Sequence, residues 1–193
     1  MRHTLSALLV LSLCAAGRAQ DPSKSDLPAR LKLVNKGETY KAPADLKKVL
    51  ADAKTSGNYP EALAVNLVLE VTNHSDKAVE FYVSGTPVTY DLQLKGPGAV
   101  SGRPRIAFPK IYILPRPVTL APGKTHKIPI TRLQYGLRNM AERAYWTEPG
   151  EYTLVARFNT SIKPAPKGAK VVDKNGFGRV TLVSEPLKIK VEK

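Results

Sequence analysis

The turn at Pro149-Gly150 leads directly into a strand-like segment, and this feature most constrains what the chain can fold into. Every second residue after the turn is apolar, namely Tyr152, Leu154, Ala156 and Phe158. Successive side chains of a β-strand point to opposite faces, so these four share one face. A second turn, Pro122-Gly123, precedes a similar alternation. The pattern predicts half-buried antiparallel strands around one core.

Eight or nine short segments of this kind follow one another with turn residues between them. The core is predicted to contain Leu67, Leu69, Phe81, Tyr90, Leu92, Tyr152, Leu154 and Phe158. Further segments are predicted as a first strand (30–34), a short strand (111–114), a loop or single helical turn (134–144), a long loop (160–178) and a final hairpin-like pair (180–191). A parallel sheet would need helices between its strands. The fold class predicted is therefore all-β, an Ig-like or fibronectin-III-like antiparallel β-sandwich.

One segment, 44–53, has helical rather than strand periodicity. Its apolar residues follow the spacing of a helix face, and they are Leu46, Val49, Leu50 and Ala53. Pro43 precedes the segment, where its missing N–H costs nothing. The sequence therefore predicts one short helix inserted into the sandwich.

The N-terminal 19 residues are predicted to be a signal peptide, because a short apolar run follows Arg2 and ends at Gly17-Arg18-Ala19. The run is shorter than the about 20 residues that a membrane-spanning helix needs. Cleavage after Ala19 would leave a disordered lead-in at 20–29 and a single domain at 30–193. The alternative is a lipoprotein signal with Cys14 as the acylated residue. Cleavage after Ala19 implies a secreted or periplasmic protein whose mature form has no transmembrane span.

The chain is strongly basic and holds a single cysteine, Cys14. Once the signal peptide is removed, thiol catalysis and cysteine-based metal sites are excluded. The formal net charge of +14 suggests anionic neighbours such as envelope polymers, whereas net charge alone favours the alternative of a generally basic, soluble surface.

Two segments gather this charge. A loop at 101–110 carries Arg103 and Arg105, and the loop at 160–178 carries Lys163, Lys167, Lys170 and Lys174. These six residues are the candidate sites for an anionic polymer or a protein partner. A contiguous patch joining both loops would favour the anionic partner, and the alternative is that each loop is a solvated connection.

Signatures of catalysis or of cofactor binding are missing from the sequence. No G-x-S-x-G motif and no phosphate-binding glycine loop occurs, so neither an enzyme nor a cofactor is expected. His74 and His126 are interpreted as a turn residue and a strand residue rather than metal ligands. The aromatic pair Tyr145-Trp146 is either a surface for stacking or, as the usual burial of Trp favours, a structural plug.

The stretch 66–158 resembles bacterial Ig-like sandwich modules, and it is closest in plan to the BsuPI family, named for an intracellular proteinase inhibitor. The resemblance rests on Val71-Thr72-Asn73, on Tyr90-Asp91-Leu92 before a Gly-rich turn, and on the two Pro-Gly units in the family's order. The whole chain also looks like secreted planctomycete proteins of unknown function that share the strings at 145–154 and 164–170. The resemblance implies that Tyr152 is the tyrosine corner of such folds. It assigns no functional residue.

Three functions remain open on the sequence. The first is a non-catalytic binding or structural domain of the cell envelope that engages an anionic polymer or a protein partner, without specific binding of nucleic acid. The second is a proteinase inhibitor that presents 161–176 as an extended loop. The third, an enzyme, has the weakest support.

Overall fold

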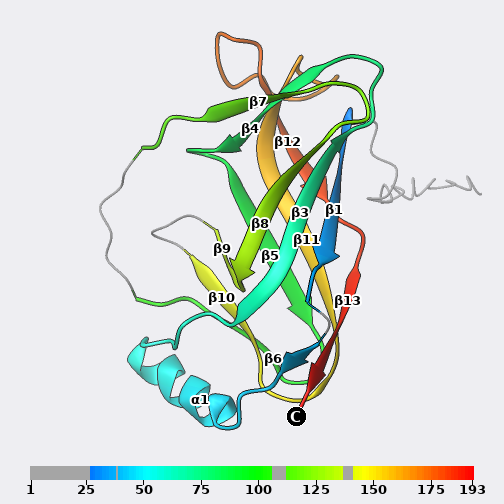
Figure 1. The fold of residues 1–193 in the computed structure, drawn as a ribbon. Coiled ribbons are helices and arrows are strands. Elements are labelled where there is room, and N and C mark those ends of the chain that lie inside the picture. The colour runs from blue at the N-terminus through cyan, green and yellow to red at the C-terminus, as the bar shows by residue number, and fades with distance from the viewer. Residues whose placement is uncertain (1–26, 38, 106–111, 137–140) are drawn as a thin grey trace, which may run out of the picture.

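The computed structural model describes residues 27–37, 39–105, 112–136 and 141–193 (Figure 1). The predicted signal peptide, Cys14 and most of the predicted lead-in lie outside these residues. Part of the predicted lead-in, Leu27 to Ala29, is in contact with the sandwich. Ala29 is buried, Leu27 packs against the core, and the Pro28 carbonyl accepts a hydrogen bond from the His74 N–H (2.8 Å).

The described residues form thirteen strands and one helix. They are β1 (Ala29–Asn35), β2 (Tyr40–Lys41), α1 (Leu46–Ser56), β3 (Ala64–Asn73), β4 (Val79–Ser84), β5 (Thr89–Lys95), β6 (Ala99–Gly102), β7 (Arg116–Leu120), β8 (Thr125–Arg132), β9 (Gln134–Tyr135), β10 (Glu142–Trp146), β11 (Gly150–Lys163), β12 (Gly178–Val183) and β13 (Leu187–Glu192).

Two sheets face each other across the core. One has the order β1-β3-β8, and the larger one is built around the long strand β11. β11 pairs with β5 along one edge, and with β12 and β13 along the other. The core draws side chains from both sheets, including Leu69 from β3 and Phe158 from β11. The predicted all-β, Ig-like sandwich with one short helix is therefore confirmed.

The predicted core is confirmed for seven of its eight residues, which are buried, and Tyr90 packs against the same core while half-buried. β3 shows the cause most clearly, because its pleat turns Leu67, Leu69 and Val71 inward in register with β1 and β8.

The helix α1 begins two residues later and ends three residues later than predicted. It ends where Gly57 adopts a left-handed conformation (φ 78°) that a residue with a side chain rarely takes up. Leu46 and Leu50 are buried against Tyr145 of β10, whereas Val49 is 43% exposed, so the apolar face is narrower than predicted. Within the described residues, no helix combines the length and the apolar character needed to cross a membrane.

A third sheet, with the order β6-β10-β9, lies where the sequence indicated irregular structure. The prediction of a loop or helical turn at 134–144 is wrong, because β9 and the first part of β10 occupy it; residues 137–140 lie outside the description. The predicted loop at 101–110 begins inside β6. The sequence of β10 lacks the alternation of a half-buried strand, because this strand is apolar on both faces. Ala144 and Trp146 face the main core, and Tyr145 between them faces α1.

Three further boundaries differ from the prediction. The expected strand at 111–114 is wrong over Tyr112–Leu114, which is exposed and irregular; Ile111 is outside the described residues. The strand forms instead at β7, an edge strand that tolerates Pro117. β11 continues to Lys163, so the predicted long loop starts only at Pro164. β12 and β13 both pair with β11 rather than with each other.

Candidate functional site

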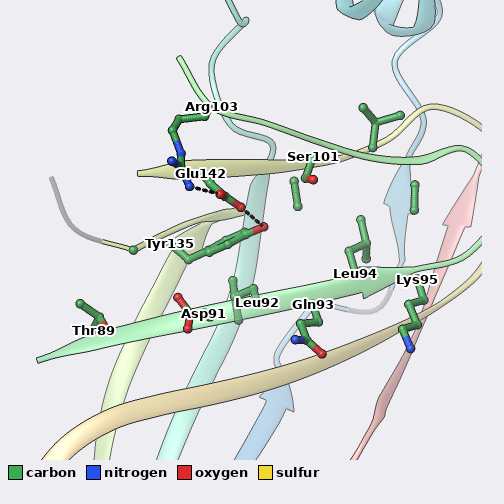
Figure 2. Close-up of a pocket in the computed structure, with 14 residues that line it drawn as sticks. Thr89, Asp91, Leu92, Gln93, Leu94, Lys95, Ser101, Arg103, Tyr135 and Glu142 are labelled. Carbon is green, nitrogen blue, oxygen red and sulfur yellow. Dashed lines mark hydrogen bonds and ion pairs between the residues drawn. The ribbon is translucent and has the colours of Figure 1, made fainter. Parts of the chain in front are cut away.

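A cavity of about 770 Å³ lies between β5 and the sheet β6-β10-β9 (Figure 2). One wall follows nearly the whole of β5, and the opposite wall comes from β6, β9 and β10 together with Arg103. Its size is in the range of small-ligand and peptide pockets in proteins. We call this cavity the β5 groove.

The β5 groove is bounded by a strand edge that carries hydrogen-bonding groups. Ala156 of β11 lies opposite Leu92. The Ala156 carbonyl accepts a hydrogen bond from the Ser184 N–H (2.9 Å), and its N–H donates to Ser184 Oγ (2.9 Å), so both groups point away from β5. In an antiparallel pair, residues directly opposite each other point both backbone groups toward the partner or both away. The N–H and C=O of Leu92 therefore point away from β11, into the groove.

The same alternation applies along the strand. Tyr90, Leu92 and Leu94 direct their backbone groups to the outer edge, whereas Asp91 and Gln93 direct theirs to β11. The Tyr90 carbonyl confirms this, because it accepts a hydrogen bond from the Gly136 N–H beyond β9 (3.0 Å). Within the described part of the chain, no further strand pairs with this edge. The open stretch is thus centred on Leu92 and Leu94.

The inner wall of the groove is apolar. Leu92 and Ala144 are buried, and Leu94 and Ala99 are half-buried. An apolar side chain that entered here would leave water and contact these four residues, which is the main source of favourable free energy in such sites.

Charged groups lie at the two ends of the groove. Arg103 forms an ion pair with Glu142, whose second oxygen accepts a hydrogen bond from the Tyr135 hydroxyl (3.3 Å; Figure 2). Burial, the charge of Glu142 and that of Asp91 raise the pKa of Tyr135 to about 12. Two carboxylates therefore act on this end of the groove. Arg103 pairs with Glu142, and Asp91 accepts a hydrogen bond from Asn159 Nδ2 (3.3 Å) and lies opposite Arg157 of β11. The opposite end carries Lys95.

The six predicted basic residues do not come together as one patch. Arg103 lines the β5 groove. Arg105 lies at the C-terminal end of α1, where its backbone N–H donates to the Gly57 carbonyl (3.3 Å). The loop 164–177 lies at the opposite end of the sandwich from α1, at the top of Figure 1. The two basic segments are thus separate surfaces.

The loop 164–177, which we call the basic loop, is fastened to β4. The Phe177 ring stacks on the Tyr82 ring with centroids 4.1 Å apart, and the Tyr82 hydroxyl donates to Asp173 Oδ2 (2.7 Å). The lysines of this segment differ in environment. Lys167, Lys170 and Lys174 are exposed, whereas Lys163 at the end of β11 is half-buried, 3.5 Å from a Glu80 carboxylate oxygen and over the Phe177 ring.

The histidines and the aromatic pair have structural surroundings. His74 is exposed in a turn. His126 lies edge-on to Phe81, and burial lowers its pKa. Among the described residues, no cluster of His, Cys, Asp and Glu has the geometry to hold a metal ion. Tyr145 and Trp146 are both buried, and the Trp146 indole N–H donates to the Lys41 carbonyl (3.0 Å), so they form a structural plug.

Comparison with known proteins gives weak similarities only. No protein-family model and no curated protein matches the chain. Among solved structures, a FixG-related protein from Vibrio parahaemolyticus is similar over 86% of this chain and 98% of its own, at 13% identity and a TM-score of 0.27. The ASH/PapD-like domain 7 of human CEP192 is similar over 100% and 99% of the two chains, at 12% identity and a TM-score of 0.27. Neither similarity carries an argument about function.

Proposed function

We propose that this protein is an exported, non-catalytic binding domain of the cell envelope that holds an extended segment of a partner protein along the open edge of β5. The observation that carries the proposal is the pairing state of this strand. One edge is fully used by β11, whereas the other presents the backbone groups of Leu92 and Leu94 to a cavity.

A peptide added to such an edge would gain main-chain hydrogen bonds for affinity and side-chain contacts for selectivity. Proteins usually protect exposed edges, because an accessible edge pairs with other chains. Here the edge lies within a cavity, which would admit a narrow extended chain more readily than a flat sheet. The mixed surroundings, apolar inside and charged at both ends, suit a peptide better than a purely anionic polymer.

Export is the second part of the proposal, and its support is the N-terminal sequence. Sequencing the N-terminus of the protein from the periplasmic or secreted fraction should give Gln20 as the first residue. An intact Met1 would contradict export by a cleaved signal, and a lipid on Cys14 would assign the protein to a membrane surface instead.

Hydrogen exchange tests the binding surface residue by residue. In the free protein the amides of Leu92 and Leu94 should exchange fast, and those of Asp91 and Gln93 slowly, because only the latter are bonded to β11. A peptide selected from a random display library on the immobilised domain should slow the first pair and leave the second unchanged.

A matched pair of variants shows whether selected peptides use the groove. Ser101→Trp places a large side chain on β6 in the groove wall and should abolish binding. Ser84→Trp makes the same change at an exposed serine on β4 outside the groove and should not. Equal binding by both variants, or protection at a different strand, would refute the proposed site.

A second candidate is binding of an anionic polymer by the basic loop. The observation that favours it is that Lys167, Lys170 and Lys174 are exposed on a segment that Tyr82 and Asp173 fasten to the sandwich. The proteinase-inhibitor alternative has less support. Ser161 and Ile162 are buried within β11, and the basic loop folds into turns, such as the one closed by Ala169 N–H and the Pro166 carbonyl (3.0 Å). A turn of this kind does not offer an extended segment to a protease.

A further inference from the structure

We infer that the β5 groove selects a segment with the order acidic, apolar, polar, apolar, basic, and that this segment runs antiparallel to β5. The inference rests on the proposed function and specifies the chemistry of the partner. It follows from the residues that an added strand would meet at each position of β5.

The register of an added strand follows from the alternation of the backbone. Its residues would lie opposite Asp91, Leu92, Gln93, Leu94 and Lys95 in turn. Those opposite Leu92 and Leu94 would form the hydrogen-bonded pairs and turn their side chains to the same face as these leucines. That face is buried and half-buried on β5, so the two positions require apolar side chains.

The charged positions follow from the two ends of the groove. A residue opposite Asp91 would meet a carboxylate whose charge also reaches Tyr135, with Glu142 bonded to the same hydroxyl. A basic side chain is therefore favoured there. A residue opposite Lys95, which is exposed, would be favoured as an acidic one. Opposite charges facing each other across a strand pair are favourable, and like charges are unfavourable.

The direction follows from strand pairing. Antiparallel pairs are somewhat more stable per residue than parallel ones. An antiparallel partner meets Lys95 first and Asp91 last. Its acidic residue therefore precedes its basic residue, with three residues between them.

The occupant is a partner segment rather than a second folded copy of this chain. β5 itself has the preferred order, in Asp91-Leu92-Gln93-Leu94-Lys95, so pairing of two β5 strands would satisfy the charges. However, β6, β9 and β10 form the wall opposite this edge (Figure 2). A single extended chain needs less room beside this edge than a second β5, which would have to enter with its own wall attached.

Two peptides of identical composition test the inference. They are acetylated and amidated and carry the cores EVTVK and KVTVE, each flanked by serines. We expect EVTVK to bind the wild-type protein about tenfold more tightly, since two charge pairs change from opposite to like. The order of preference should reverse in the double variant Asp91→Lys, Lys95→Asp. It should be unchanged in Glu70→Lys, Lys127→Glu, a charge exchange on the opposite sheet.

Hydrogen exchange at Leu92 and Leu94 separates the possible failures. Equal affinity of the two peptides with protection of both amides would overturn the charge pattern and leave strand addition intact. Tighter binding of KVTVE would overturn the antiparallel direction. Failure of every peptide, including library-selected ones, to protect these amides would refute the proposed function itself. Sedimentation as a dimer with both amides already protected would identify the occupant as a second copy.

Discussion

The rings of Tyr82 and Phe177 lie nearly parallel, at 14°, and this contact joins the basic loop to strand β4. Tyr82 follows Phe81 on β4, and because Phe81 points into the core, Tyr82 points to the outer face of the sheet. The loop covers it there, so that only 8% of Tyr82 is exposed. A segment rich in Lys, Pro and Gly is therefore attached to β4 by an aromatic pair and a carboxylate, and to β12 by the hydrogen bond from the Arg179 N–H to the Lys170 carbonyl (2.9 Å).

The attachment of the basic loop to Tyr82 should be lost at acid pH, because it depends on the ionised Asp173 carboxylate. Its oxygens accept hydrogen bonds from the Tyr82 hydroxyl and from the backbone N–H groups of Phe177 and Asn175, and these bonds lower its pKa below the usual value. A lowered pKa in the folded state means that the attachment is complete above the usual carboxyl range and is lost as the pH falls through the lowered value. The ring-current shifts of Phe177 should therefore stay constant at neutral pH and collapse only below about pH 4.

Two substitutions isolate this effect. Asp173→Asn keeps the acceptor oxygen but cannot titrate, so the Phe177 shifts should no longer change at acid pH. Asp173→Ala removes the carboxylate contacts, so it should weaken the attachment to Tyr82 equally at every pH. If the wild-type and Asn variants titrate alike, another group controls the attachment.

Alkaline pH should also lower the stability of the protein, in this case through ionisation of the Tyr82 hydroxyl. Burial, and then the hydrogen bond to Asp173, raises the pKa of Tyr82 to about 12. The contribution of the neutral Tyr82 hydroxyl to the free energy of unfolding is fully present below the usual tyrosine pKa of about 10 and is lost as the pH rises towards 12. The free energy of unfolding should fall over this interval in the wild type, and less in Tyr82→Phe. The same slope in both proteins would assign it to other tyrosines.

Binding of a polyanion should depend on the three lysines of the basic loop and much less on Lys163 at the end of β11. The triple variant Lys167→Gln, Lys170→Gln, Lys174→Gln should lose most heparin affinity, with the melting temperature almost unchanged. Lys163→Gln should lose little, because this ammonium group already faces Glu80. Rising salt should weaken wild-type binding smoothly, since exposed charges are screened over about 8 Å at physiological ionic strength. A triple variant that binds as tightly as the wild type would leave the basic loop as a connection only.

Neighbouring residues of β3 should respond very differently to truncation. Leu69 is fully buried between the sheets, so Leu69→Ala should lower the free energy of unfolding by about 2–5 kcal/mol. The Glu70 side chain is 19% exposed and lies 3.6 Å from Lys127, so Glu70→Ala should cost about 1 kcal/mol or less. Urea denaturation of both variants measures this. Equal losses of free energy would mean that Leu69 and Glu70 are assigned to the wrong faces of β3, because a register slip of one residue exchanges the two faces.

The sequence predicted those elements whose pattern is set by one buried face. β3 and β11 alternate cleanly because one side packs on the core, and the helix shows its buried residues at helical spacing. β10 has no such pattern, because Trp146 faces the core while Tyr145 beside it faces α1. Its identity as a strand depends on a helix almost a hundred residues away in the sequence.

The β5 groove could not be predicted for a similar reason. The alternation from Tyr90 to Leu94 identifies a strand but says nothing of how many neighbours it has. That number is set by β11 on one side and by the course of the chain through β6 and β10 on the other. The basic residues were visible in the sequence, but their separation to opposite ends of the sandwich depends on the fold. Only Arg103 of the six lines the groove.

The tyrosine corner at Tyr152 should stabilise two turns, at 96–98 and 147–149. The ring is buried, and its hydroxyl donates to the Glu148 carbonyl (2.7 Å) and lies against the Pro97 carbonyl. Tyr152→Phe removes the donor and leaves a carbonyl without its partner, which should lower the free energy of unfolding by about 1–3 kcal/mol at an unchanged denaturant slope. Tyr112→Phe is the control, because this residue is 67% exposed and should change stability by less than about 0.5 kcal/mol.

The corner should also affect the groove. The turn at 96–98 links β5 to β6 at the Lys95 end, and its Gly98 carbonyl accepts a hydrogen bond from the Thr147 N–H (3.2 Å). In Tyr152→Phe the Thr147 amide should exchange faster. The amides of Asp91 and Gln93 should stay protected, because they are hydrogen-bonded to β11. Peptides that rely on Lys95 should then bind more weakly, because the position of that end is less well fixed. Unchanged exchange at Thr147 together with unchanged stability would mean that the hydroxyl contributes nothing to the turn.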